Sequence, residues 1–188
     1  MKGFFNNKAQ TLIDLKIKKG KIPKLIKIKF DDYFKDKRKF LNKIGIFFRN
    51  KKIIIRSSFS NEDTNRSSNA GKYESYLNIN SNDFKEIDLK IKRLSKLKNK
   101  IKGENFFIQE MVKDVSFSGV VLTRNLEDYT KCININFFDG KNTEAVTSGR
   151  TETKSIVFFE NDKFKIPKKF FNLYLCVKEI IQFTNEPD

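Results

Sequence analysis

The stretch IIIRSSFSNEDTNRSSNAGKYESYLNI, from Ile53 to Ile79, decides which fold and which chemistry this sequence predicts. An apolar run typical of a β-strand ends in Arg56-Ser57-Ser58, and a loop rich in serine and asparagine follows it. A guanidinium binds oxyanions bidentately, hydroxyl groups donate hydrogen bonds, and the glycine at Gly71 permits a tight backbone turn. The stretch therefore predicts a site that binds phosphate.

The composition limits the classes of protein that this chain can belong to. It has 188 residues and a net charge of +16, with 20 phenylalanines and no histidine. This length suits one domain or two small lobes with a real hydrophobic core. The charge fits an anionic partner, but Lys, Asn, Ile and Phe are abundant together, a pattern typical of a nucleotide bias in the coding sequence. Without histidine, the chain cannot carry a phosphohistidine itself.

The two cysteines, Cys132 and Cys176, lie far apart in the sequence and have no metal-ligand spacing. They predict neither a disulfide framework nor a zinc site, which favours a reducing, cytoplasmic setting. No apolar run approaches the roughly 20 residues of a membrane span. Lysines and an aspartate interrupt the N-terminal region, unlike a signal peptide. We therefore expect a cytoplasmic protein without a membrane partner.

Hydrophobic periodicity predicts helices and strands along the whole chain. Residues 7–20 and 33–44 favour helices, 25–30 favour a strand with lysines on one side, and 53–55 favour a short strand. Residues 84–101 favour a helix that ends at Gly103. The second half favours strands at 106–112, 117–123, 132–138 and 155–159, followed by a buried helix at 170–183. We expect a boundary near Gly103, with a mixed lobe over 1–103 that carries the phosphate-binding residues and a sheet-rich lobe over 104–188.

Several motifs resemble one known family, and they occur in the same order as in that family. The family's patterns are "GGKGANL…G…P", "RSSA…ED…AG…LN", "VQxMV", "SGVxFTR" and "GLGExVVSGR"; the matching segments here are residues 6–23, 56–79, 107–112, 118–124 and 139–150. Together they resemble the ATP-binding domain shared by phosphoenolpyruvate synthase and pyruvate phosphate dikinase. The resemblance implies an α+β, ATP-grasp-like fold, in which two lobes with mixed and antiparallel sheets are flanked by helices and hold ATP between them.

The resemblance assigns the phosphate site to the first lobe. It implies that Lys8 and Arg56 hold the nucleotide phosphates as the catalytic pair, and that Ser57, Ser58 and Gly71 complete the site. The chain departs from the family pattern where asparagines replace the paired glycines before Lys8.

The resemblance assigns the base and the ribose to the second lobe. Gln109, Glu110 and Val112 match the hinge whose backbone reads adenine, and Glu144 matches a residue that binds the ribose hydroxyls or a neighbouring basic group. The family's glycines are missing from 141–143, just before Glu144.

The resemblance also implies an activity. The family transfers a phosphoryl group from ATP first to a histidine on a mobile domain and then to an acceptor such as pyruvate. Its Mg²⁺ ions are held by an acidic pair; Asp188 corresponds either to the first residue of that pair or to the residue before it, so the metal ligands are expected beyond this chain and none is assigned here. We therefore expect a domain truncated at its C-terminus, part of an intact phosphotransferase but inactive as this chain alone.

Three alternatives stay open at this point. The short interval between Pro23 and Arg56 resembles the branch that holds amide kinases such as L-glutamine kinase, which act in capsule modification. The departures from the motifs are compatible with a pseudoenzyme that binds nucleotide without turnover. The interleaved lysines and phenylalanines are compatible with a nucleic-acid-binding module, although no helix-turn-helix, zinc or RNP-like pattern supports it.

Overall fold

The computed structural model describes residues 8–59, 63–64, 67–68, 75–97, 101–141, 152–159 and 166–184, of which 63–64 and 67–68 are described by their backbone alone. The chain folds into two units. The first unit contains residues 1–15 and 22–111, and the second contains 16–21 and 112–188. The chain therefore passes between the units at 15/16, at 21/22 and at 111/112.

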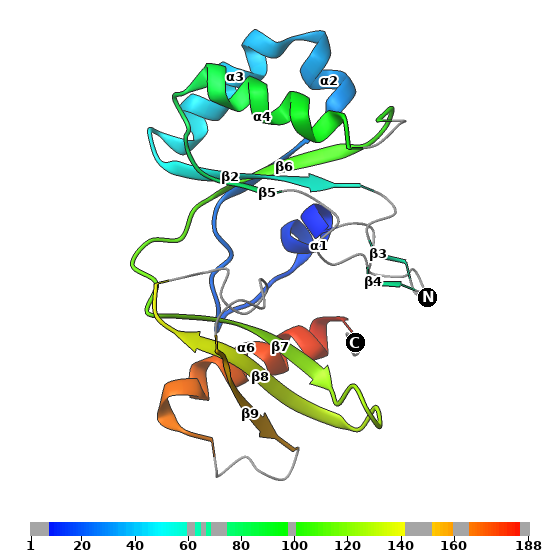
Figure 1. The fold of residues 1–188 in the computed structure, drawn as a ribbon, viewed down its shortest axis with the longest axis vertical. Helices are drawn as coiled ribbons and strands as arrows, with labels where there is room; N and C mark the ends of the chain where they lie inside the picture. The colour runs from blue at the N-terminus through cyan, green and yellow to red at the C-terminus, as the bar shows by residue number, and fades with distance from the viewer. Residues whose placement is uncertain are drawn as a thin grey trace. The chain divides into compact units, whose positions relative to one another are not determined.

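A four-stranded antiparallel sheet forms the centre of the first unit (Figure 1). Its strands are β1 (Leu25–Lys29), β6 (Asn105–Glu110), β2 (Lys52–Ser58) and β5 (Ser75–Asn80), in that spatial order. β6 lies between β1 and β2, and its Phe107 is the cross-strand partner of both Lys27 and Arg56. Paired residues point to the same face of a sheet, so this register decides which side chains gather there.

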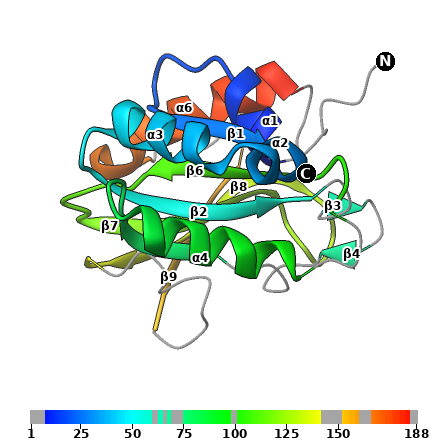
Figure 2. The same cartoon turned by 90° about the horizontal axis from the view of Figure 1, so that it is seen from above.

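Helices cover the two faces of this sheet unequally. α2 (Phe30–Lys35), α3 (Lys37–Phe48) and α4 (Phe84–Ser95) lie on one face, and α1 (Lys8–Asp14) lies on the other (Figures 1 and 2). Aspartates cap two of these helices: the Asp36 carboxylate accepts a hydrogen bond from Lys39 N, and the Asp83 carboxylate accepts one from Glu86 N. A short hairpin of β3 (Asp63–Thr64) and β4 (Ser67–Ser68) completes the described part of this unit.

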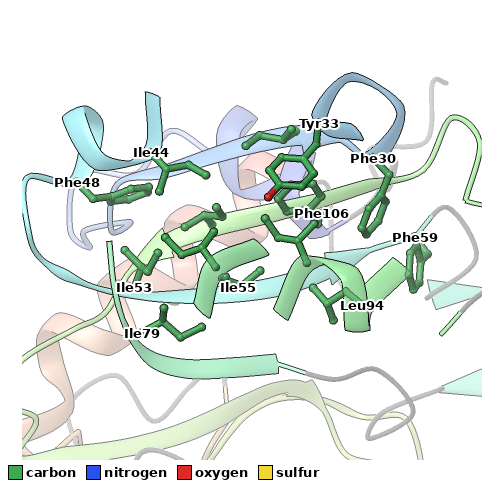
Figure 3. Packing of buried hydrophobic residues seen from close by; sticks show 14 residues of the cluster. Phe30, Tyr33, Ile44, Phe48, Ile53, Ile55, Phe59, Ile79, Leu94 and Phe106 are labelled. Atoms are coloured by element: carbon green, nitrogen blue, oxygen red, sulfur yellow. The ribbon is translucent and has the colours of Figure 1, made fainter. Parts of the chain in front are cut away.

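The core of the first unit fills the space between the sheet and helices α2, α3 and α4 (Figure 3). Residues four apart on α3, Ile44 and Phe48, point inward together. Alternate residues of β2, Ile53 and Ile55, meet them from the sheet. The other fully buried side chains in this core include Phe30, Tyr33, Phe59, Ile79, Ile87, Ile91, Leu94, Phe106 and Ile108. Each contributes about 1.5–3 kcal/mol by leaving water.

A three-stranded antiparallel sheet and one long helix form the second unit. The strands are β7 (Phe117–Arg124), β8 (Lys131–Asp139) and β9 (Lys154–Phe158), in the order β7-β8-β9, and the helix is α6 (Lys168–Thr184). The buried residues of this core come from the inward face of β8, the end of β9 and one side of α6: Ile133, Ile135, Phe137, Phe158, Phe170, Tyr174 and Val177.

The predicted fold class is confirmed, because the structure mixes helices with antiparallel sheets and is compatible with an ATP-grasp-like α+β fold. The predicted helix over 33–44 is observed as two helices. They are separated at Asp36, whose backbone is non-helical and whose side chain caps the second helix. Strand β5 was not predicted. A register shift opposite Ile53 and Ile55, and a positive φ of 62° at Asn78, interrupt the alternation that announces a strand.

The division of the chain differs from the expected boundary near Gly103. Strand β6, expected in the 104–188 lobe, pairs on both sides with strands of the first unit. The first unit therefore extends to Met111. In addition, residues 16–21, expected in the first lobe, belong to the second unit.

The described helices and the two cysteines bear on the expected environment of the chain. Of the helices that the structure describes, none has the length and apolar character needed to cross a bilayer. Cys132 is buried and Cys176 is partly buried, and both are free thiols. Burial raises the pKa of each thiol above its ordinary value, which makes both poor nucleophiles at neutral pH.

Candidate functional site

One hydrogen bond joins the start of α1 to the end of β2. The backbone N–H of Ala9 donates to Oγ of Ser58 at 3.3 Å, and Ser58 is fully buried. Lys8 is the first residue of α1, and Arg56 lies two residues before Ser58 on β2. The bond therefore brings together two segments that are 49 residues apart in the sequence and that carry the two predicted phosphate ligands.

Strand alternation places Arg56 on the same face as this contact. Residues 56 and 58 point to one side of β2 because side chains alternate with a period of two. Figure 1 shows α1 on that side, opposite α2, α3 and α4. The guanidinium carbon of Arg56 lies 5.6 Å from the ring centroid of Phe107, its cross-strand partner. This cation–π contact holds the guanidinium against the sheet.

A third cation lies on the same face. Lys27 on β1 pairs with Phe107 from the other side of β6, so it points in the same direction as Arg56. Its Nζ donates to Oε1 of Gln10 on α1 at 2.5 Å. We call this side of the sheet the α1 face, defined by Lys27, Arg56, Ser58, Phe107 and Gln109.

The α1 face is positively charged. By strand alternation it also receives Lys29 from β1 and Lys52 from β2, while no Asp or Glu of the four described strands points to it. Several cations gathered on one face of a sheet create a positive potential that attracts anions. The sequence predicted Lys8 on α1 and Arg56 on β2 as phosphate ligands, and strand pairing adds Lys27, on the edge strand β1, to the face that carries Arg56.

Ser57 does not join the other predicted phosphate ligands. It is 4% exposed and points to the opposite, helix-covered face, as Ile53 and Ile55 do. Ser58 is on the α1 face, where its hydroxyl accepts the Ala9 N–H. The resemblance gave the two serines the same role, but adjacent residues of a strand point to opposite faces.

The predicted adenine hinge lies where the chain leaves the first unit. The side chain of Gln109 is on the α1 face and is 9% exposed. Glu110 points the other way, and its carboxylate binds Lys51 Nζ at 2.5 Å. The N–H of Glu110 donates to Lys24 O at 2.8 Å. Val112 belongs to the second unit and is 57% exposed. The Glu110 N–H is thus already bonded to the chain just before strand β1.

Two predicted site residues, Gly71 and Glu144, lie outside the described residues. In the "SGV" motif, by contrast, the structure gives the glycine a packing role. A Cβ at Gly119 would lie 2.4 Å from the backbone oxygen of Asn136 on the neighbouring strand. Close strand pairing therefore explains this glycine without a ligand.

Sequence reasoning missed Lys27, Gln10 and Phe107. A signal for Lys27 was present, because the lysines of residues 25–30 alternate with isoleucines and so indicate a strand with one charged face. Nothing in the sequence showed which neighbour that face would meet. The pairing of β1 with β6, about 80 residues away, supplies this information.

The described residues do not fit a Mg²⁺ site. In that part of the chain no three or more of the side chains His, Cys, Asp and Glu group closely enough to hold a metal ion. We therefore derive no catalytic step through a metal for these residues.

One protein-family model matches part of the chain. Residues 6–93 match the family model described as "Pyruvate phosphate dikinase, AMP/ATP-binding domain". No curated protein sequence matches the chain. The matched segment contains Lys8, Arg56 and Ser58, and it ends before the predicted hinge at 109–112. The match therefore covers just under half of the chain, and over residues 6–93 the sequence is similar to the AMP/ATP-binding domain of pyruvate phosphate dikinase.

Proposed function

We propose that the first unit binds the phosphate tail of ATP on the α1 face. Lys8 and Arg56 would bind the phosphate oxygens, and Lys27 would be a third cation for the same anion. The observation that carries this proposal is the hydrogen bond from Ala9 N to Ser58 Oγ, because it brings the start of α1 to the strand that carries Arg56. A guanidinium binds phosphate bidentately, and an ammonium adds a point charge.

The neighbouring residues would prepare the site for the ligand. Phe107 stacks under the Arg56 guanidinium, and Ser58 fixes the start of α1. Both contacts restrict groups that would otherwise lose rotational freedom when the anion binds, and such preorganisation raises affinity.

The segment 109–112 would contact the base. Gln109 would do so with its side chain on the α1 face, and Val112 with its peptide group, because the Glu110 N–H already bonds to Lys24. Gly71 would allow a tight turn beside the phosphates, and Glu144 would bind the ribose hydroxyls.

The reaction that this site would serve is phosphoryl transfer to a histidine. The chain contains no histidine, so the phosphohistidine would be carried by a further domain or chain, which would then pass the group to an acceptor such as pyruvate. We expect the present chain by itself to bind ATP without metal-dependent turnover.

Nucleotide titration tests the phosphate site. Arg56→Ala should weaken ATP binding roughly 10- to 100-fold, the range for loss of a charged, bidentate hydrogen-bonding group. AMP should be affected less, since it lacks the β- and γ-phosphates. Arg38→Ala is the matched control, because Arg38 is an exposed arginine on α3, which covers the opposite face of the sheet. Equal ATP affinity in wild type and Arg56→Ala would contradict the proposal.

A salt titration separates this function from nucleic-acid binding. A nucleic-acid-binding module would hold a DNA or RNA oligonucleotide at physiological salt, and its affinity would fall steeply as salt increases. We expect the chain to form no such oligonucleotide complex at physiological salt. Tight oligonucleotide binding that Arg56→Ala leaves intact would favour the other class.

A further inference from the structure

Residues 16–21 connect α1 to β1 and are bound to the second unit, although both elements belong to the first. Within this connector, the backbone N–H groups of Lys18 and Lys19 donate to the same carboxylate oxygen, Oε2 of Glu179 on α6, at 2.8 and 2.9 Å. Two hydrogen bonds from consecutive amides to one charged acceptor fix the path of the backbone.

A second contact holds the same connector against α6. Gly20 packs on Cys176, so closely that a Cβ at position 20 would lie 2.6 Å from Cys176 Sγ and 2.8 Å from Cδ1 of Ile17. Cys176 is three residues before Glu179, which places both on one side of the helix. The N–H of Lys19 and then that of Lys18 keep the pKa of Glu179 below its ordinary value against the effect of burial, so the acceptor is ionised at neutral pH.

We propose that Glu179 is a positioning residue for α1, and through α1 for Lys8 in the nucleotide site; the second half of this statement depends on the proposed function. α1 is anchored to the sheet by hydrogen bonds near its start, including the one between Lys27 and Gln10. It is one of the shortest described helices, with Ala9 as its buried residue, and its start is held by the Ala9–Ser58 hydrogen bond. Its end continues within two residues into the connector that Glu179 holds. Because α1 has only about two turns, freeing the connector would loosen the whole helix, including the Ala9–Ser58 hydrogen bond.

Amide hydrogen exchange tests this proposal without any nucleotide. In Glu179→Ala, the amides of Lys18 and Lys19 should exchange faster, and so should the Ala9 amide, although Ala9 lies on the first unit. Gln182→Ala is the matched control, since Gln182 is exposed on the next turn of α6. Glu179→Gln keeps an acceptor oxygen and should have an intermediate effect. If the connector amides accelerate while Ala9 is unchanged, or if none of them changes, the positioning role is refuted.

A double-mutant cycle tests the link to the nucleotide. Glu179→Ala should raise the Kd for ATP roughly three- to tenfold in wild type and leave it nearly unchanged in a Lys8→Ala background, because residues that act through one another are not additive. In an Arg56→Ala background the effect should remain. Equal effects in all three backgrounds would overturn the proposal. If wild type binds no ATP, the proposed function fails, and the exchange at Ala9 still decides whether Glu179 positions α1.

Discussion

Replacing Tyr33 with phenylalanine removes one hydroxyl from the core of the first unit and keeps the ring. Tyr33 is fully buried, and its OH donates to Oδ1 of Asp88 at 2.9 Å. The same carboxylate binds Lys92 at 2.6 Å and Lys37 at 3.4 Å. Phenylalanine would retain the packing against Phe106, whose ring centroid is 5.7 Å away. The substitution therefore isolates one hydrogen bond to a charged acceptor.

The magnitude follows from the charge and partial exposure of the acceptor. Hydrogen bonds to charged groups contribute about 1.5–3 kcal/mol. The side chain of Asp88 is 22% exposed, so water can replace part of the lost bond. We expect Tyr33→Phe to lower the free energy of unfolding by about 1.5–2 kcal/mol, which corresponds to a decrease in Tm of roughly 3–8 °C for a chain of this size.

The pH dependence gives a sharper test. Burial raises the pKa of the Asp88 carboxyl, but hydrogen bonds from Lys92 and Tyr33 and the charge of Lys37 together lower it below its ordinary value. A carboxyl whose pKa is lower in the folded state stabilises the fold above its unfolded pKa, and this contribution is lost as the pH falls through the folded pKa. Burial, and then the bond to Asp88, raise the pKa of Tyr33 well above its ordinary value, so Tyr33 remains a donor throughout this range.

Urea unfolding followed by far-UV circular dichroism, at several pH values between 7 and 3, measures these quantities. The difference in the free energy of unfolding between wild type and Tyr33→Phe should have its full value above about pH 5 and should shrink below about pH 4. Amide exchange in α2 and α4 would assign the loss to the first unit. A difference that is absent at pH 7, or that stays constant down to pH 3, would refute this account of Tyr33 and Asp88.

Three further predictions follow from single contacts. Gly119→Ala should destabilise the second unit by about 2–4 kcal/mol, because the new Cβ meets the Asn136 carbonyl. Gly103→Ala should cost only about 1–2 kcal/mol in backbone strain, because Gly103 has a φ of +79° but open space around it. Thermal unfolding that ranks the two variants in the reverse order would contradict this. In a calorimetric titration, Lys27→Met should weaken the binding of ATP more than the binding of AMP. Equal losses of affinity for both nucleotides would show that Lys27 does not contact the phosphates. Asp83→Ala should cost about 1 kcal/mol through loss of the α4 N-cap, measured by urea unfolding, and an unchanged midpoint would show that the cap contributes nothing.

Local patterns predicted most elements of the fold. The one-sided strand at 25–30 is β1, the lysine-faced helix from Phe84 is α4, and the apolar segment near Phe170 is α6. These elements could be predicted because their burial follows the period of the backbone. Strand β5 could not, because a bulge disrupts its alternation. The end of the first unit could not either, because it depends on which distant strands pair with β6.

For the candidate site too, some parts could be predicted from the sequence and others could not. Lys8 and Arg56 were predicted as phosphate ligands from residue type and motif, and the Ala9–Ser58 bond joins the two segments that carry them. The separation of Ser57 from Ser58, and the addition of Lys27, required the sheet. Motifs indicate the chemistry of a residue, whereas strand pairing and alternation decide which face that chemistry occupies.

The connector at 16–21 has a consequence for synthesis on the ribosome. Lys18 and its acceptor Glu179 are 161 residues apart, so at typical elongation rates of 5–20 residues per second roughly 8–30 s separate their translation. During that interval α1 and β1 are joined by the connector, but α6, which carries Glu179, has not yet been synthesised. A chaperone or neighbouring nascent chain has that interval in which to capture the unprotected loop, and silent codon changes that slow translation after residue 111 would lengthen it.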